Sequence, residues 1–280
     1  MCRDISSGTL PPVKRTFVIG DIHGDLFHLL QLMGKLPSLG PRDTLVFLGD
    51  YVDRGPASAG VVDYVRKLPQ HTPAKVVTLR GNHEDAWLRV IDGGWPEFVL
   101  PRSNGCLEAY RSFKRLPAPQ PDDAPEPREF AEMLTGAFFP PDVVAWMRTL
   151  PYFYEDEFAI YVHAGIPKKG GAFAHPSEVE PKTALLWTRD TDFFRNYRGK
   201  TVVFGHTKTA LLPAELSQYT PEDPEDMWAG PAVLGLDTGC GKGGFLTAVE
   251  FPRKRVYESR KRRRHVPPNT QRSPTSRRHG

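Results

Sequence analysis

Short apolar runs recur along the chain, and each is followed directly by polar residues. The runs are RTFVIG (15–20), TLVFLG (44–49), KVVTLRG (75–81), AIYV (159–162) and TVVFG (201–205). They are rich in Val, Ile, Phe and Leu and show no polar alternation, which is typical of strands buried on both faces. We therefore expect a buried strand in each run, with a polar loop at its carboxyl end.

Amphipathic segments with apolar residues at helical spacing lie between and after these runs. They cover residues 25–36, 58–68, 83–91 and 142–150. A succession of strand, loop and helix predicts an α/β fold with a mostly parallel sheet. In such folds, ligands bind beyond the carboxyl ends of the strands.

The remaining segments have weaker patterns. Residues 151–165 predict a hairpin that turns near Glu155–Glu157, and residues 233–239, 244–251 and 255–259 predict three late antiparallel strands. Residues 213–232 have the composition of a surface loop. Residues 93–140 break the rhythm, and their proline-rich acidic part, 118–129, indicates either a loop insertion or a lid over the site. Phe138 and Phe139 are expected in the core.

The polar groups at the strand ends form one set of side chains with a common chemistry. The set is Asp21, His23, Asp50, Asn82, His163 and His206. It holds imidazole nitrogens and carboxylate or amide oxygens but no thiolate, which suits Mn²⁺, Fe or Zn²⁺ in a catalytic site better than a structural zinc site. Six side chains exceed the needs of one ion with an open position, and they fit two ions that share a carboxylate.

Each of these residues has an ordinary structural interpretation when it is taken alone. Asp21 or Asp50 could cap a helix, Asn82 could serve a turn, and a single loop histidine is more often hydrogen-bonded than a metal ligand. Their joint placement after five predicted strands favours the metal site.

Composition restricts the class of protein. Of 280 residues, 39% are hydrophobic and 25% are charged, which is an ordinary globular balance. No apolar run approaches the length of a membrane span, and the first residues lack the apolar core of a signal peptide. Cys2, Cys106 and Cys240 form no CxxC pair and no disulfide framework. We expect a cytoplasmic protein in a reducing compartment.

The formal net charge of +4 comes from the carboxyl-terminal end of the chain. Residues 260–280 hold eight Arg or Lys residues and no acid, which leaves 29 basic and 33 acidic residues, about −4, in residues 1–259. The tail composition predicts a solvated, disordered terminus. The alternative is a contact for anionic partners such as RNA or lipid head groups.

The ordered motifs carry a family resemblance. GDIHG (20–24), GDYVDRG (49–55), GNHE (81–84), HAG (163–165) and GHT (205–207) resemble the phosphoprotein phosphatase family of calcineurin-like metallophosphoesterases, and LDTGC (236–240) extends the likeness. The sequence is most similar to bacterial serine/threonine phosphatases and symmetrical diadenosine tetraphosphatases. This resemblance implies an α-β-β-α sandwich, in which two packed mixed sheets are flanked by helices. The catalytic domain would span 15–259, with an extension at 1–14 and the basic tail at 260–280.

The resemblance also implies roles for the metal ligands. Asp21 and His23 would bind the first ion, and Asp50 would bridge both ions. Asn82, His163 and His206 would complete the pair, with the two histidines on the second ion. Mn²⁺ is the preferred ion, with Fe or Zn²⁺ as alternatives, and a metal-bound hydroxide would attack phosphorus directly.

Further residues are implied to act on the substrate. His83 would protonate the leaving oxygen, and Asp53 would hold its imidazole in place. Arg54 would bind the phosphoryl oxygens in a bidentate manner, with Asn82 beside it. Arg189 matches the place of a second phosphate-binding arginine, although a surface salt bridge to Asp190 or Asp192 is the alternative.

Glu84 follows His83, and either a helix cap or indirect support of His83 would explain it. No role is assigned to the other histidines of the chain, His28, His71, His175, His265 and His279.

Two substrate classes remain open. An aspartate precedes the arginine in DYVDRG, as in protein phosphatases, so the first hypothesis is a serine/threonine or dual-specificity protein phosphatase that acts on phosphorylated proteins. The second is a symmetrical dinucleoside polyphosphate hydrolase with a nucleotide substrate. A non-catalytic scaffold is disfavoured because all six ligands are present, and GDIHGD lacks the glycines of a dinucleotide-binding loop. The oligomeric state is not predicted.

Overall fold

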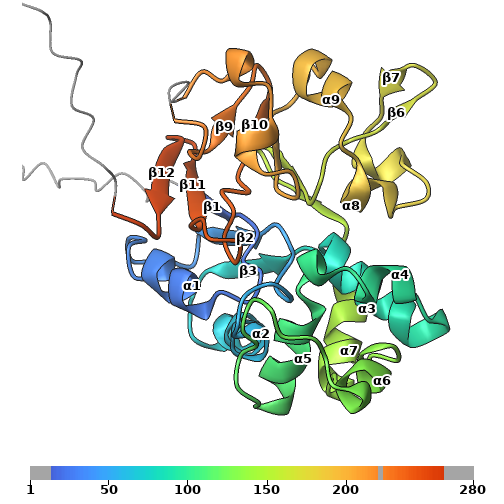
Figure 1. The fold of residues 1–280 in the computed structure, drawn as a ribbon. Coiled ribbons are helices and arrows are strands. Elements are labelled where there is room, and N and C mark those ends of the chain that lie inside the picture. The colour runs from blue at the N-terminus through green and yellow to red at the C-terminus, as the bar shows by residue number, and fades with distance from the viewer. Residues whose placement is uncertain (1–13, 220–222, 262–280) are drawn as a thin grey trace, which may run out of the picture.

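Two five-stranded sheets pack face to face and carry helices on their outer faces (Figure 1). The structure is a computed structural model and describes residues 14–219 and 223–261. The predicted extension therefore lies outside the described residues except for its last residue, and the basic tail does so beyond residue 261. The arrangement confirms the predicted sandwich of two mixed sheets.

The first sheet has the strand order β12-β11-β1-β2-β3. Its strands are β1 (Thr16–Ile19), β2 (Thr44–Phe47), β3 (Lys75–Thr78), β11 (Thr247–Phe251) and β12 (Arg255–Glu258). β1, β2 and β3 run parallel, whereas β11 pairs antiparallel with β1 and with β12. The parallel part places the loops after β1, β2 and β3 at one edge of the sheet.

The second sheet has the order β4-β5-β8-β10-β9. Its strands are β4 (Phe153–Glu155), β5 (Ile160–Val162), β8 (Val202–Phe204), β9 (Trp228–Ala229) and β10 (Val233–Gly235). β5, β8 and β10 are parallel, and the edge strands β4 and β9 are antiparallel. β4 and β5 form the hairpin that was predicted from residues 151–165.

Alternate residues of each strand face different layers. Val18 of β1 and Val46 of β2 lie in the core between the sheets, where they join Tyr161 of β5 and Val203 of β8. Their sequence neighbours, such as Phe17, point to the helices on the outside. The strands are buried on both faces because each sheet is covered twice, which explains their continuous apolar runs.

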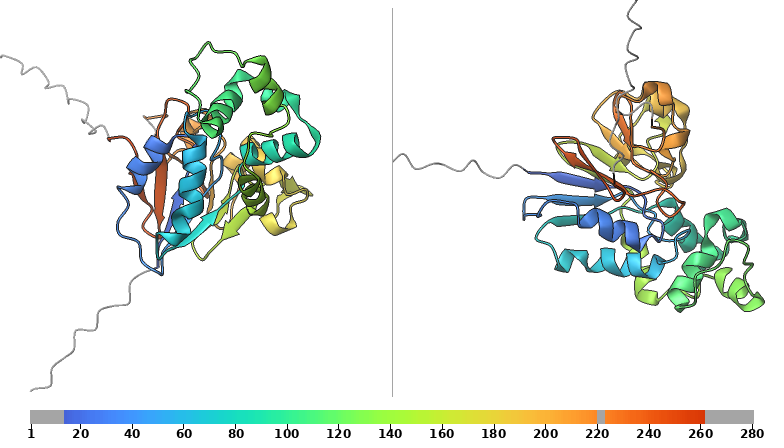
Figure 2. Two further views of the ribbon diagram at one scale, coloured as in Figure 1. Left: turned by 90° about the horizontal axis from the view of Figure 1, so that it is seen from below. Right: turned by 60° about the vertical axis from the view of Figure 1, so that its left-hand side comes forward.

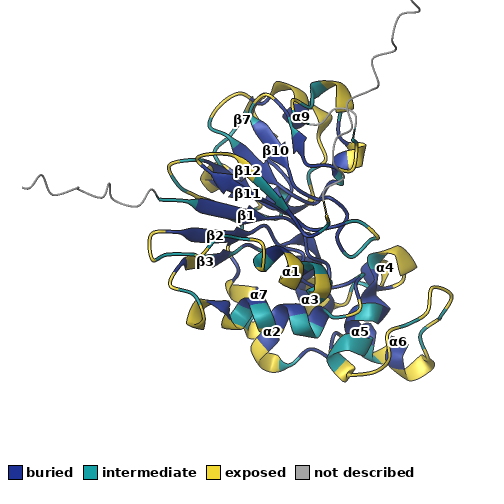
Figure 3. Ribbon diagram, turned by 90° about the vertical axis from the view of Figure 1, so that its left-hand side faces the viewer, coloured by how far each residue is buried: buried dark blue, intermediate teal, exposed yellow. Residues whose placement is uncertain are grey.

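The helices form the two outer layers (Figures 2 and 3). They are α1 (Leu26–Met33), α2 (Ser58–Lys67), α3 (Asn82–Gly93), α4 (Pro96–Val99), α5 (Cys106–Lys114), α6 (Pro127–Met133), α7 (Pro141–Thr149), α8 (Ala184–Trp187) and α9 (Thr191–Asn196). The first seven contribute to the core outside the first sheet, and α8 and α9 to the core outside the second sheet. A small hairpin of β6 (Lys168–Lys169) and β7 (Ala172–Phe173) lies apart from both sheets.

Residues 93–140 are more ordered than a loop insertion. They include α4, α5 and α6, with an irregular stretch through the proline-rich acidic part. Trp87 of α3 lies at their centre and makes edge-to-face contacts with Phe98, Phe138 and Phe139. Phe138 and Phe139 are 6% and 5% exposed, so their assignment to the core is confirmed. The pattern missed these helices because they are short: α4 and α6 begin at prolines, and α5 directly follows a glycine.

Two late segments differ from the prediction. Residues 233–235 form β10, which pairs parallel with β8 in the second sheet and not antiparallel with the other late strands. Residues 213–232 contain β9, whose Trp228 is buried, so this segment is not wholly a surface loop. A three-residue apolar run reveals a strand but not the sheet it joins. The antiparallel pairing of β11 with β12 is as predicted.

Two further observations bear on the compositional expectations. Cys106 and Cys240 are buried free thiols, and Cys2 lies outside the described residues. Over residues 14–219 and 223–261, no helix has the length and apolarity needed to cross a bilayer.

Candidate active site

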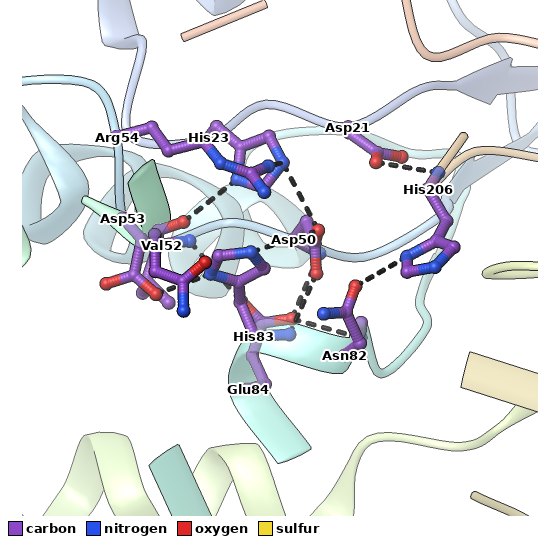
Figure 4. A network of polar contacts seen from close by, with 12 residues as sticks. Asp21, His23, Asp50, Val52, Asp53, Arg54, Asn82, His83, Glu84 and His206 are labelled. Atoms are coloured by element: carbon purple, nitrogen blue, oxygen red, sulfur yellow. Dashed lines mark hydrogen bonds and ion pairs between the residues drawn. The ribbon is translucent and has the colours of Figure 1, made fainter. Parts of the chain in front are cut away.

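The loops that follow β1, β2, β5 and β8 meet the start of α3 at one end of the sandwich. All six predicted metal ligands come together there, and each is at most 5% exposed. Figure 4 shows most of this group, with Asp50 between the side chains from β1 and those from α3. The sequence placed these residues at separate strand ends, and the parallel strands bring those ends together.

Asp50 is the centre of the group. Its Oδ2 lies 3.2 Å from Nε2 of His23 and 4.0 Å from Nε2 of His83. Its Oδ1 lies 3.5 Å from Nε2 of His163 and accepts the backbone N–H of His83 at 3.0 Å. Two triads of side chains that could hold a metal ion therefore share this carboxylate, His23–Asp50–His83 and Asp21–Asp50–His163.

Hydrogen bonds to backbone carbonyls set the orientation of two histidines. His163 Nδ1 lies 2.9 Å from the carbonyl oxygen of Leu48, and His23 Nδ1 lies 3.2 Å from that of Val52. Only a protonated Nδ1 can donate to a carbonyl, so in the neutral rings Nε2 carries the lone pair. Both Nε2 atoms face Asp50, as expected for metal-ligating histidines held by a carbonyl.

The lone pairs of His163 and Asn82 consequently face each other inside a buried site. Asn82 Oδ1 lies 2.8 Å from Nε2 of His163 and 2.7 Å from Nδ1 of His206. Asp21 Oδ1 and His206 Nε2 have no hydrogen-bond partner among the described residues. Buried acceptors that face each other or lack a donor are costly. A cation on each side of Asp50 would satisfy them, so the residues fit a pair of divalent ions.

The protonation states also suit cations. Burial lowers the pKa of His23, His163 and His206, which favours the neutral rings that can bind a metal. Burial and the nearby carboxylates of Asp237 and Asp50 raise the pKa of Asp21 well above its usual value. Carboxylates in such a site repel one another when ionised, and a bound cation would relieve that repulsion.

His83 belongs to a second chain of contacts. Its Nδ1 lies 2.6 Å from Oδ2 of Asp53, and the indole N–H of Trp87 donates to both oxygens of Asp53 at 2.9 and 3.0 Å. Phe98 lies against the other side of the imidazole, with 5.4 Å between ring centroids. Burial raises the pKa of Asp53, whereas its bond with His83 lowers it. His83 is thus held by one carboxylate while its Nε2 faces Asp50.

Arg54 and Arg189 approach the site from different sides. The side chain of Arg54 contacts the ring of His23. The backbone N–H of Arg54 donates to the carbonyl of Gly105 at 3.2 Å, so the segment 93–140 contacts the loop after β2. Arg189 is exposed. Its positive charge adds to the larger effect of burial, and both lower the pKa of His206.

The alternative for Arg189, a salt bridge to Asp190 or Asp192, is not formed. Asp190 caps α9 by accepting the backbone N–H of Asp192, and Asp192 pairs with Lys168 at 2.5 Å. Over the described residues, neither acid pairs with Arg189. Its guanidinium is therefore left near the metal-ligating group.

Glu84 has a function that the motif alone did not reveal. Its carboxylate accepts the backbone N–H of Gly81 at 3.0 Å, which confirms the predicted cap of α3. It also accepts the N–H groups of Asp50, Tyr51 and Val52 at 3.0, 2.8 and 3.3 Å. One carboxylate thus joins the loop after β2 to the loop after β3.

The loops are held in an unfavourable backbone conformation. Five site residues have positive φ: His23, Asp50, Asp53, Arg54 and His206. Over the described residues, only Arg115 and Lys254 share this feature among residues other than glycine. Each such residue costs on the order of 1–3 kcal/mol and persists only where its surroundings enforce it, as at functional sites.

Glycines let the loops approach closely. A Cβ atom on Gly205 would lie 1.9 Å from Oδ1 of Asp21, and one on Gly81 would lie 2.2 Å from Oδ1 of Asp50. Any side chain there would displace a predicted ligand, which explains why a glycine precedes the polar residues at these strand ends.

Sequence reasoning missed two further residues of the site. Asp237 follows β10 and is fully buried, and Lys242 Nζ lies 3.4 Å from its Oδ2. After burial, the negative charge of Asp237 is the next cause that raises the pKa of Asp21. The motif LDTGC marked the position of Asp237, but its contact with Lys242 depends on a glycine-rich turn that has no regular pattern.

The family model for calcineurin-like phosphoesterases matches residues 14–210. This match covers well over half of the 280 residues, and the chain belongs to this family of metal-dependent phosphoester hydrolases.

Individual relatives act on different substrates. The chain is 28% identical over 259 residues to the asymmetrical bis(5'-nucleosyl)-tetraphosphatase PrpE of Anoxybacillus flavithermus, covering 84% of this chain and 89% of that protein. It is 32% identical over 93 residues to a catalytic subunit of protein phosphatase 2A from Dictyostelium discoideum, covering 33% of this chain and 30% of that one.

Among solved structures, that of a candidate diadenosine tetraphosphatase has a TM-score of 0.52 and 24% identity over 89% of this chain and 95% of that one. This likeness concerns the fold.

The contacts of Glu84 predict a large loss of stability when its carboxylate is replaced. In Glu84→Gln, one pair of backbone N–H groups faces an amide NH₂ in place of an oxygen. Two buried donors without acceptors cost about 2–6 kcal/mol at about 1–3 kcal/mol each. The free energy of unfolding, measured with urea on the chelator-treated protein, should fall by that amount.

The matched control is Glu97→Gln, because Glu97 is exposed on α4. It should change the unfolding free energy by less than about 0.5 kcal/mol. If both variants unfold like the wild type, Glu84 does not hold the two loops together.

Proposed function

We propose that the chain is a metal-dependent phosphomonoesterase that acts on phosphoserine or phosphothreonine residues of proteins. The observation that carries this proposal is the buried pair of His83 and Asp53, with 2.6 Å between Nδ1 and Oδ2. An alkoxide is a poor leaving group and needs a proton, so a positioned acid has most effect on alkyl phosphates.

The proposed metal ligands are Asp50, which both ions would share, and the five residues around it. Two divalent ions, when bound, polarise the phosphoryl group and make a hydroxide nucleophile available near neutral pH. Mn²⁺ is the proposed ion, with Fe or Zn²⁺ as alternatives, because the donor set is mixed nitrogen and oxygen. The facing lone pairs of Asn82 and His163 support this assignment.

Arg54 would bind the phosphoryl oxygens. Its guanidinium is planar and forked, so it can hold two oxygens in a fixed orientation. The positive φ of Arg54, +68°, and its backbone bond to Gly105 keep the side chain at the ring of His23. Asn82 would assist from the start of α3, and Arg189 would reach the phosphoryl group from the side of His206.

His83 would deliver the proton to the leaving oxygen. With Nδ1–H donating to Asp53, an imidazolium also carries a proton on Nε2. Transfer of that proton leaves a neutral ring whose Nδ1–H still donates to Asp53. Asp53 therefore positions His83 and stabilises its charged form, as a carboxylate does for other catalytic histidines.

A second candidate is hydrolysis of dinucleoside polyphosphates. The match with PrpE over 84% of this chain favours it, whereas the match with the protein phosphatase covers 33%. The sequence motifs favoured symmetrical cleavage, while the PrpE relative is asymmetrical.

The cytoplasmic location and an anionic partner for the tail remain predictions from composition.

One comparison of substrates decides between the candidates. With Mn²⁺, we expect kcat/KM for a phosphoserine peptide to exceed that for diadenosine tetraphosphate, because the His83–Asp53 pair serves an alkoxide leaving group. Release of inorganic phosphate and of nucleotides would be measured for each substrate. A reversed ratio would assign the chain to nucleotide hydrolysis and would overturn the protein phosphatase proposal.

Replacement of His83 tests the proton transfer. His83→Asn should lower kcat on the phosphoserine peptide by about 10²–10⁴-fold, the usual effect of a general acid. It should lower kcat on p-nitrophenyl phosphate much less, because nitrophenolate leaves without a proton. Asp53→Asn should show the same bias more weakly.

Arg54→Ala is the matched control for leaving-group dependence, because it should impair both substrates alike. Bound metal must be measured in each variant. Equal losses on both substrates for His83→Asn, or loss of metal from it, would identify His83 as a ligand or structural group.

A further inference from the structure

The loop between β10 and β11 brings a lysine into the site. Residues 239–244 read GCGKGG, and Gly239, Gly241 and Gly243 have φ of +78°, +69° and +84°. A Cβ atom on Gly241 would lie 2.3 Å from the carbonyl oxygen of His23. The turn therefore packs closely against the loop after β1. Lys242, the next residue after Gly241, is thereby placed near His23, a predicted metal ligand.

Lys242 differs from an ordinary surface lysine. Its side chain is 17% exposed, and Nζ lies 3.4 Å from Oδ2 of Asp237, whose side chain is fully buried. Over the described residues this is the one hydrogen bond of Nζ, and it is longer than the usual 2.7–2.9 Å of a charge-assisted bond. An ammonium group has three N–H donors. At least two donors therefore remain for a ligand.

The surroundings of Lys242 indicate the charge of that ligand. Lys242 lies within electrostatic reach of Arg54 and of the carboxylates of Asp21 and Asp50. Arg54 and Lys242 are both close enough to His23 for their positive charges to add to the effect of burial, which lowers the pKa of its ring. Asp237 is the nearest of the carboxylates, whereas Asp21 and Asp50 are predicted metal ligands whose charge bound ions would offset. The two cations would then repel each other, and an anion bound by both would relieve that repulsion. The phosphoryl group of a substrate is the anion that this site would receive.

We propose that Lys242 binds the phosphoryl group together with Arg54 and is a further cation of the phosphate-binding site. This rests on the proposed function in that the anion is a substrate phosphoryl group. Arg54 orients two oxygens through its rigid fork, whereas the ammonium group of Lys242 supplies charge with freer geometry. Asp237 holds Lys242 next to the site in the absence of substrate.

A purely structural role for Lys242 makes a different prediction. If Lys242 only neutralises the buried charge of Asp237, then removing both charges should restore the site. If Lys242 binds phosphate, the double variant should stay impaired, because the donor itself is missing. The pair Lys242→Gln and Lys242→Gln/Asp237→Asn therefore separates the two roles.

The experiment measures binding of inorganic phosphate to the full chain loaded with Mn²⁺, by calorimetry and by competitive inhibition of p-nitrophenyl phosphate hydrolysis. Lys242→Gln should weaken phosphate binding about 10- to 100-fold, as expected for the loss of a charged hydrogen bond. Its KM should rise in parallel while bound metal stays unchanged. Lys242→Arg should recover part of the affinity, and the double variant should remain weak.

Lys200→Gln is the matched control. Lys200 is also a partly buried lysine that pairs with a carboxylate, Glu155, but it lies at the opposite ends of β5 and β8. The Lys200→Gln variant should bind phosphate with the affinity of the wild type.

Three results would overturn the proposal. They are wild-type phosphate affinity in Lys242→Gln, full recovery in the double variant, and loss of metal from Lys242→Gln. Failure of the proposed function has a different result: kcat/KM of the wild type is higher for diadenosine tetraphosphate than for the phosphoserine peptide, while its phosphate affinity still depends on Lys242.

Discussion

The structure depends on a concentration of buried lone pairs around the Asp50 carboxylate. Carbonyls of Leu48 and Val52 take the Nδ1 protons of His163 and His23, so the Nε2 atoms of both rings face Asp50 as acceptors. Arg54 is a donor for Nε2 of His23, but among the described residues Nε2 of His163 faces only the oxygens of Asn82 and Asp50, and Nε2 of His206 has no partner. Positive charge between them is the physical requirement, and a pair of divalent ions meets it.

The fold supplies the means to hold such a site. Parallel strands in both sheets end at the same edge, and the Glu84 carboxylate ties the loop after β2 to the loop after β3 through four backbone N–H groups. The bonds oppose the cost of positive φ at Asp50 and its neighbours. The segment 93–140 adds Phe98 against His83 and Gly105 against Arg54.

Much of this arrangement was predictable from the sequence, because buried strands have a simple pattern and a polar residue follows each one. Asp21, Asp50 and His206 were placed correctly at strand ends for that reason. The sheet of β10 was not predictable, since a short apolar run does not encode its neighbours. The four bonds of Glu84 depend on two loops far apart in sequence. Lys242, between glycines, has the sequence of an ordinary turn.

Metal stoichiometry tests the central claim most directly. Native mass spectrometry of the full chain with Mn²⁺ should show two ions per chain, both removed by chelator. Asp50→Asn should lose both ions, because the carboxylate is shared, whereas the exposed control Asp63→Asn on α2 should keep them. Binding of one ion or none by the wild type, or two ions retained by Asp50→Asn, would contradict a paired site centred on Asp50.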